Sequence, residues 1–181
     1  MKRFFTLLLS LTVVFALLVG FGQASGSDLE NDTSFPSKDA LVWEPEITFS
    51  TVDSSGEEWT DLCFQDAELT MLNLWAYWCP PCVAELPDLQ KLSEDYAEQG
   101  FQIFGVSREE YEKDNIETME KLGVSYPCLR MTESLEEPLS TGYIPTTIFV
   151  NREGWIVSEQ YVGGRSYESW AEIIEGLLEE S

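Results

Sequence analysis

Two kinds of hydrophobic pattern alternate along residues 46–178. Short apolar or alternating runs are typical of strands, and they cover residues 46–52, 69–76, 101–106, 126–131, 146–150 and 155–162. Apolar residues spaced three or four positions apart are typical of amphipathic helices, and they cover residues 81–98, 111–122 and 166–178. Strands that alternate with helices, followed by a hairpin and a last helix, predict an α/β fold with a mixed central sheet flanked by helices.

The first 24 residues have the pattern of an export signal. Lys2 and Arg3 precede an uncharged run over residues 4–21, and the small residues Gly22-Gln23-Ala24 follow it like a cleavage site. The 18 uncharged residues also reach the lower limit for spanning a bilayer. Residues 1–24 are therefore either a signal peptide or an uncleaved membrane anchor. Both alternatives place the rest of the chain outside the cytoplasm, in the periplasm or at the outer face of the cell membrane, where disulfides persist.

The remainder of the chain divides into a linker and one domain. Residues 25–40 are rich in Ser, Asp, Asn and Gly and have no apolar period, as expected of a linker. Residues 41–181 are enough for a single domain with its own core, and they contain no internal repeat.

Charge narrows the range of partners. The chain contains 33 acidic residues against 10 basic ones, and without Lys2 and Arg3 the net charge becomes about −25. Such a charge argues against binding nucleic acid or anionic lipid. Two interpretations remain open: a solubilising acidic surface, or a surface that attracts a basic partner.

The candidate chemistry lies at the junction of an apolar run and a predicted helix, in Trp78-Cys79-Pro80-Pro81-Cys82. Backbone N–H groups at a helix N-terminus favour an anion, so Cys79 is expected to be the nucleophilic thiolate. Cys82, one turn later, is the resolving thiol that attacks a mixed disulfide. A disulfide that encloses only two residues contributes little stability, which argues against a purely structural bridge.

A metal site is not expected. The chain contains no histidine, and the other two cysteines, Cys63 and Cys128, lack a partner at ligand spacing. The sequence also indicates no cofactor. For Cys63 and Cys128 three alternatives stay open: buried thiols, a second disulfide, or a redox relay to Cys79–Cys82.

Four stretches of sequence resemble the thioredoxin superfamily and, within it, the TlpA/ResA-type extracytoplasmic thiol-disulfide oxidoreductases. The matching stretches are residues 72–82, 85–87, 142–147 and 149–156, within a similarity that covers about residues 46–178. The resemblance implies a thioredoxin-like fold with an N-terminal extension and an inserted helix and strand at residues 111–131. It also implies reduction of protein disulfides, for example in cytochrome c maturation, with electrons from a membrane dithiol protein.

The resemblance assigns roles to individual residues. Glu85 matches a glutamate that follows the second cysteine in this family, and a raised pKa would let it hold or give a proton. Ile144-Pro145 matches the cis-proline that faces the dithiol and offers backbone groups to a substrate strand. Trp78, Pro80 and Pro81 are expected to contact the substrate as well.

Two other functions are alternatives to disulfide reduction. A thiol peroxidase needs a nearby Thr and Arg to activate its cysteine, and no Arg is near Cys79 in sequence. A non-catalytic binding module on the same fold would not need both cysteines of the motif.

Overall fold

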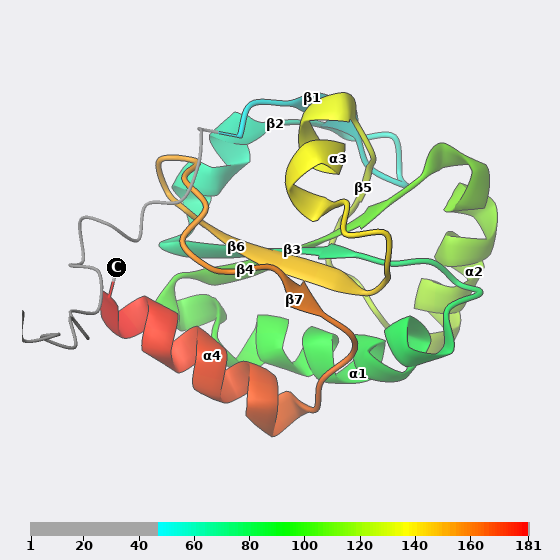
Figure 1. Ribbon diagram of the computed structural model, residues 1–181. Helices are drawn as coiled ribbons and strands as arrows, with labels where there is room; N and C mark the ends of the chain where they lie inside the picture. Colours follow the sequence, from blue (N-terminus) through cyan, green and yellow to red (C-terminus); the bar gives the residue numbers. More distant parts are fainter. Residues whose placement is uncertain (1–46, 181) are drawn as a thin grey trace, which may run out of the picture. The chain divides into compact units, whose positions relative to one another are not determined.

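The computed structural model describes residues 47–180, so the expected export segment, the linker and residues 41–46 lie outside the described residues. A five-stranded sheet with the order β5-β4-β3-β6-β7 forms its centre (Figure 1). The strands are β3 (Leu69–Leu74), β4 (Phe101–Ser107), β5 (Cys128–Arg130), β6 (Thr146–Asn151) and β7 (Tyr161–Val162). β3, β4 and β5 pair in parallel, whereas β6 is antiparallel to both β3 and β7, which confirms the predicted mixed sheet.

Helices and a small second sheet cover the two faces (Figure 1). The α-helices are α1 (Pro80–Asp95), α2 (Glu112–Leu122), α3 (Glu133–Leu139) and α4 (Tyr167–Glu180). Helices α1 and α4 pack side by side on one face. The other face lies under α3, the 3-10 helix η2 (Asp61–Asp66) and the antiparallel pair β1 (Ser50–Val52) and β2 (Glu58–Thr60). Two short 3-10 turns, η3 (Ala97–Gln99) and η4 (Glu109–Tyr111), complete the connections.

Each face of the sheet has its own hydrophobic core. On the α1 and α4 side, Leu86, Leu89 and Trp170 are fully buried against the strands. On the opposite side, Phe64 of η2 and Leu135 of α3 are equally buried. Burial of this apolar area from water on both faces is the main driving force for folding.

The inserted segment lies at one edge of the sheet. It supplies α2 and the edge strand β5, as the sequence predicted for residues 111–131. Gly123 ends α2 in the left-handed conformation, with φ of 71°. Gly100 has φ of 83° and ends the 3-10 turn after α1, so both glycines terminate helices as a C-cap glycine does.

Two predicted strands differ from the structure. The strand expected over 46–52 is shorter, since only Ser50–Val52 pairs, with β2. The strand expected over 155–162 is interrupted: Ile156 bridges to Val150, and regular pairing resumes only in β7. The reason is local, because the Ser158 hydroxyl, rather than a backbone carbonyl, accepts the hydrogen bond from the N–H of Phe149.

Three elements were not predicted at all: β2, η2 and α3. Helix α3 is capped by Thr132, whose hydroxyl accepts a hydrogen bond from the N–H of Leu135. Pro138 lies in its last turn and hides the helical pattern, since proline usually marks the end of a helix in a sequence. No helix within residues 47–180 is long and apolar enough to cross a membrane.

Candidate active site

Cys79 caps the N-terminus of α1. Its Sγ accepts a hydrogen bond from the backbone N–H of Cys82 at 3.3 Å, in the place where a serine or aspartate oxygen usually stands. Pro80 and Pro81 occupy the first two helical positions, where no backbone donor is required. Cys79 and Cys82 form a disulfide with an Sγ–Sγ distance of 2.05 Å. The sulfur of Cys79 therefore lies where a helix terminus stabilises negative charge.

The two sulfurs differ in access. Cys82 is fully buried, whereas Cys79 keeps a small exposed surface. Of the two cysteines, Cys79 is therefore the more exposed to an incoming sulfur. Its role as nucleophile, with Cys82 as the resolving thiol, stays a prediction.

A loop before β6 faces the disulfide. The Ile144–Pro145 peptide bond is cis, as the resemblance implied, and the carbonyl oxygen of Ile144 lies 3.6 Å from Cys79 Sγ. The carbonyl of Pro145 accepts a hydrogen bond from the N–H of Gly163 at 2.9 Å. The loop is thereby tied to the segment that precedes α4.

Glu85 is buried beneath the motif. The residue is 3% exposed, and its carboxyl group receives three hydrogen bonds. Oε1 accepts from Asn73 Nδ2 at 3.1 Å, and Oε2 accepts from the backbone N–H of Arg165 at 3.1 Å and from Trp170 Nε1 at 3.3 Å. Burial raises the pKa of Glu85, and these hydrogen bonds only partly oppose the shift. The raised pKa lets this carboxyl keep its proton to a higher pH than an exposed glutamate does.

Sequence reasoning missed the segment Gly163-Gly164-Arg165. Gly164 passes so close to the motif that a Cβ atom there would lie 2.9 Å from the carbonyl oxygen of Pro81 and 3.5 Å from Glu85 Oε2. The guanidinium of Arg165 lies over the ring of Trp170, 5.0 Å from its centroid. The adjacent glycines before a helix were the available signal, but nothing in the sequence shows that they approach residue 81.

Exposed aromatic side chains border the disulfide. Trp78 is 52% exposed and Tyr143 is 72% exposed, and both line a groove of about 220 Å³. The ring of Trp78 packs edge-on against Tyr111, with 5.7 Å between centroids. Asn115 of α2 accepts a hydrogen bond from the N–H of Tyr77 at 2.8 Å. The inserted segment therefore positions the loop that leads into Cys79, whereas Trp75 is buried in the core.

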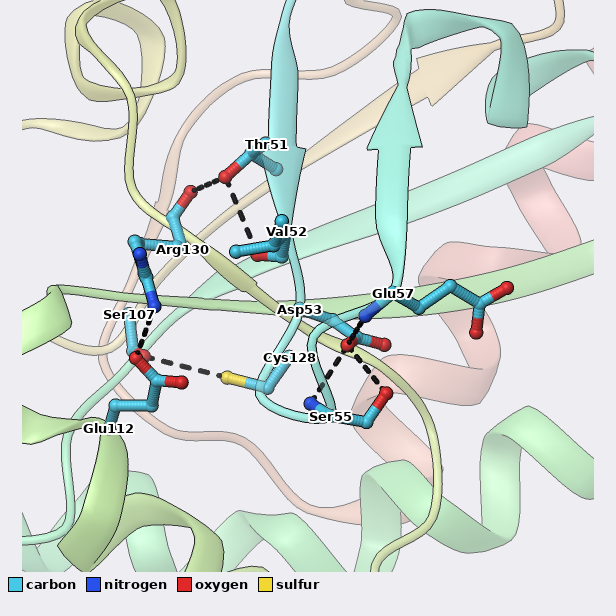
Figure 2. Close-up of polar contacts among 9 residues, drawn as sticks. All are labelled: Thr51, Val52, Asp53, Ser55, Glu57, Ser107, Glu112, Cys128 and Arg130. Carbon is cyan, nitrogen blue, oxygen red and sulfur yellow. Dashed lines mark hydrogen bonds and ion pairs between the residues drawn. The ribbon is translucent and has the colours of Figure 1, made fainter.

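Cys63 and Cys128 are both free and buried, and they belong to separate core clusters. The structure thus contains no second disulfide among its described residues. Burial raises the pKa of Cys63 to about 12 and that of Cys128 to about 11, so both stay protonated at neutral pH and are poor nucleophiles. Figure 2 shows the Cys128 thiol directed at the Ser107 hydroxyl, at 3.6 Å, beside the turn that Asp53 organises.

Across residues 47–180, no group of three or more His, Cys, Asp or Glu side chains is placed to hold a metal ion.

Replacing Gly164 with Ala should destabilise the protein by about 1–3 kcal/mol, because the new Cβ would press on the backbone of Pro81. Urea denaturation of the oxidised protein measures this. The matched control is Gly176→Ala in α4, where no atom lies within 4 Å of the added Cβ and a gain of about 0.5–1 kcal/mol is expected. A Gly164→Ala protein as stable as the wild type would contradict the close approach.

The raised pKa of Glu85 predicts a pH-dependent stability. Between the pKa of the unfolded chain and the higher folded pKa, the folded state binds more protons, so the free energy of unfolding falls as pH rises. In the Glu85→Gln variant this loss is absent. The stability of the variant relative to the wild type should therefore increase with pH through that window, by at most about 1.4 kcal/mol per pH unit, and then level off. Urea denaturation in acid-to-neutral buffers tests this, and parallel curves would exclude it.

Known proteins share this architecture. Residues 44–158 match the family model described as the AhpC/TSA family. The chain is 29% identical to the thiol-disulfide oxidoreductase ResA of Halalkalibacterium halodurans, over 99% of this chain and 98% of that protein. It is 30% identical to the thiol:disulfide interchange protein DsbE of Pasteurella multocida, over 98% of this chain and 95% of that protein.

A solved structure agrees with these relatives. The thioredoxin-family thiol:disulfide interchange protein of Chlorobium tepidum TLS superposes with a TM-score of 0.65 at 28% identity, covering 74% of this chain and 95% of that one. The resemblance inferred from the sequence and the thioredoxin-like fold are thereby confirmed. With its Cys79–Cys82 pair, the chain belongs to the AhpC/TSA family and is a thiol-disulfide oxidoreductase of the ResA/DsbE type.

Proposed function

We propose that this oxidoreductase reduces disulfides of other proteins outside the cytoplasm. One observation carries the proposal: the sulfur of Cys79 caps α1, is the accessible one of the pair, and lies 3.6 Å from the carbonyl oxygen of Ile144. A substrate disulfide can then approach along the cis-proline loop and meet a thiolate that the helix terminus stabilises.

The cycle begins with the reduced pair. The Cys79 thiolate attacks one sulfur of the substrate disulfide, and the other substrate sulfur leaves as a thiolate and takes up a proton. The Cys82 thiolate then attacks Cys79 Sγ, breaks the mixed disulfide and releases the second substrate thiolate. The product is the Cys79–Cys82 disulfide. An external dithiol must reduce it again by donating two electrons and two protons, and that dithiol becomes a disulfide in turn.

Glu85 supplies the base for the second step. It follows Cys82 by three residues and so shares its side of α1. The carboxylate accepts the Cys82 thiol proton as that sulfur attacks, and the resulting acid later returns the proton to solvent or to the departing thiolate. The raised pKa of Glu85 brings its affinity for protons closer to that of a thiol, which makes this transfer less costly.

The direction of electron flow follows from charge. Pro80 and Pro81 add no charge between the cysteines, and the domain is strongly acidic; both features disfavour an extreme thiolate. Strong oxidants of this fold owe their potential to an unusually stabilised thiolate. A reductase is therefore favoured over an oxidant.

Substrate binding is assigned to the surface around the disulfide. Trp78 and the two prolines of the motif would contact the partner from one side, and Ile144 and Pro145 would pair with it as a short strand. The acidic surface favours a basic partner through long-range attraction.

The cellular setting is proposed from the export pattern and the resemblance. Residues 1–24 would export or anchor the protein, residues 25–40 would link them to the domain, and residues 41–181 would act in the periplasm or at the outer face of the membrane. The disulfides of apocytochrome c or of its handling factors are the candidate substrates. A membrane dithiol protein would return the electrons.

Substituting Cys82 with Ser should trap substrates as stable mixed disulfides on Cys79, because the resolving thiol is missing. Non-reducing gels followed by mass spectrometry identify the trapped protein and its cysteine. The Cys79→Ser variant is the control and should trap nothing, since Cys82 is buried. Full function retained by Cys82→Ser in a strain that lacks the wild-type protein would instead favour a non-catalytic binding module.

The equilibrium reduction potential should lie between those of protein disulfide isomerase and thioredoxin, at about −180 to −270 mV. Redox titration against glutathione and dithiothreitol buffers, followed by Trp fluorescence or alkylation, measures it. A value near −120 mV, typical of strong oxidants, would overturn the proposed direction.

A further inference from the structure

Asn73 is fully buried in β3, directly beneath the motif. It lies opposite Thr147 of β6 in the antiparallel register. Both hydrogens of its amide nitrogen are used: Nδ2 donates to Glu85 Oε1 at 3.1 Å and to Thr147 Oγ1 at 2.9 Å. One amide therefore joins the buried carboxyl to the strand that follows the cis-proline.

The other half of this amide is unsatisfied. Asn73 Oδ1 is buried and has no hydrogen-bond partner among the residues that the structure describes. A buried acceptor left in this way costs about 1–3 kcal/mol. Buried polar groups are rarely left unpaired, so this one calls for a physical explanation.

The three groups that donate hydrogen bonds to Glu85 suggest an explanation for the unpaired Asn73 Oδ1. Of the three, the backbone N–H of Arg165 and the indole N–H of Trp170 can only donate, and they suit the carboxylate. Once Glu85 is protonated, its O–H needs an acceptor. Asn73 is the single group among these three that carries both a donor and an acceptor.

We propose that Asn73 and Thr147 are positioning residues that let Glu85 change its protonation state without losing its hydrogen bonds. With the carboxylate, Asn73 Nδ2 donates to Glu85 and to Thr147. With the carboxylic acid, the amide turns by half a rotation. Oδ1 then accepts from the Glu85 O–H and from the Thr147 hydroxyl, while Nδ2 takes the position that Oδ1 held and gives up its own two hydrogen bonds. Thr147 serves both states because a hydroxyl can accept or donate.

The inference rests on the proposed function, in which Glu85 takes the Cys82 proton and later releases it. Only a proton is transferred, from Cys82 to Glu85. The Asn73 amide and the Thr147 hydroxyl reorient but are not ionised. Other groups also act on Glu85. The guanidinium of Arg165 favours the carboxylate, whereas the buried Tyr126 phenol interacts with it electrostatically from the side of β5.

The amide orientation can be read directly by NMR. In the isotope-labelled oxidised protein, the Glu85 carboxyl carbon reports its protonation, and NOEs from the Asn73 amide protons to the Thr147 side chain report the orientation. We expect these NOEs at high pH and their loss at low pH, with the same midpoint as Glu85. In the Glu85→Gln variant the NOEs should not depend on pH.

Thr147 provides the matched pair of variants. In Thr147→Val the carboxylate-facing amide leaves an N–H unpaired, whereas the turned amide still accepts from Glu85. The midpoint of the Glu85 titration should therefore rise by up to about one pH unit in this variant. Thr147→Ser keeps the hydroxyl and should keep the wild-type midpoint.

An amide that holds one orientation through the Glu85 titration overturns the inference. So does a Glu85 carboxyl that never titrates while the protein is folded, or a midpoint that Thr147→Val leaves unchanged. None of these measurements needs a substrate or a reductant. Failure of the proposed function appears separately, as a Glu85→Gln protein that resolves mixed disulfides at the wild-type rate.

Discussion

The carboxyl group of Glu85 joins four parts of the structure within one buried site. It projects from α1 and binds Asn73 of β3, the backbone before α4 at Arg165, and Trp170 within α4. Removing a carboxylate from water is costly, and only donors from several elements together can offset that cost. The packing of α1 and α4 on the sheet therefore determines the protonation of Glu85, and Glu85 in turn requires that packing.

Cys79 is subject to a related constraint at the start of the same helix. The free N–H groups of a helix N-terminus need an acceptor, and here a sulfur atom provides it. A thiolate is a better acceptor than a disulfide sulfur, so this end of α1 is better satisfied when the pair is reduced. The overall acidity of the domain opposes that effect, which keeps the stabilisation of the thiolate moderate.

The sequence predicted the parts of the fold that carry their own pattern. Helix α1 is an example, because its apolar spacing, its N-terminal prolines and Gly100 all agree. The sequence could not predict β2, because its three residues form a strand only by pairing with β1. The interruption before β7 likewise depends on one hydroxyl of Ser158 that replaces a backbone acceptor.

At the active site, too, features with a local sequence pattern could be predicted, and features that depend on contacts distant in sequence could not. The cysteines, Glu85 and the cis-proline could be named from their motifs, since these are local in sequence or carried by the resemblance. Gly164 and Arg165 could not, because their contacts with α1 span some 80 positions of chain and appear only after folding. Whether Cys63 and Cys128 form a disulfide also could not be predicted from the sequence. The folded structure places them in separate hydrophobic cores.

The identity of residue 73 matters for the site, because the group that hydrogen-bonds Glu85 from β3 is an uncharged amide. A second carboxyl at 3.1 Å from Glu85 would make the two groups share protons, as like charges in a low-dielectric site cannot both ionise. With an amide there, Glu85 has no second carboxyl at this contact with which to share a proton. Its proton affinity is then determined by burial and by donors from three elements, and any displacement of α4 or of the cis-proline strand changes it. In the proposed cycle, proton exchange at Glu85 is thus coupled to the same contacts that hold the cis-proline loop in place.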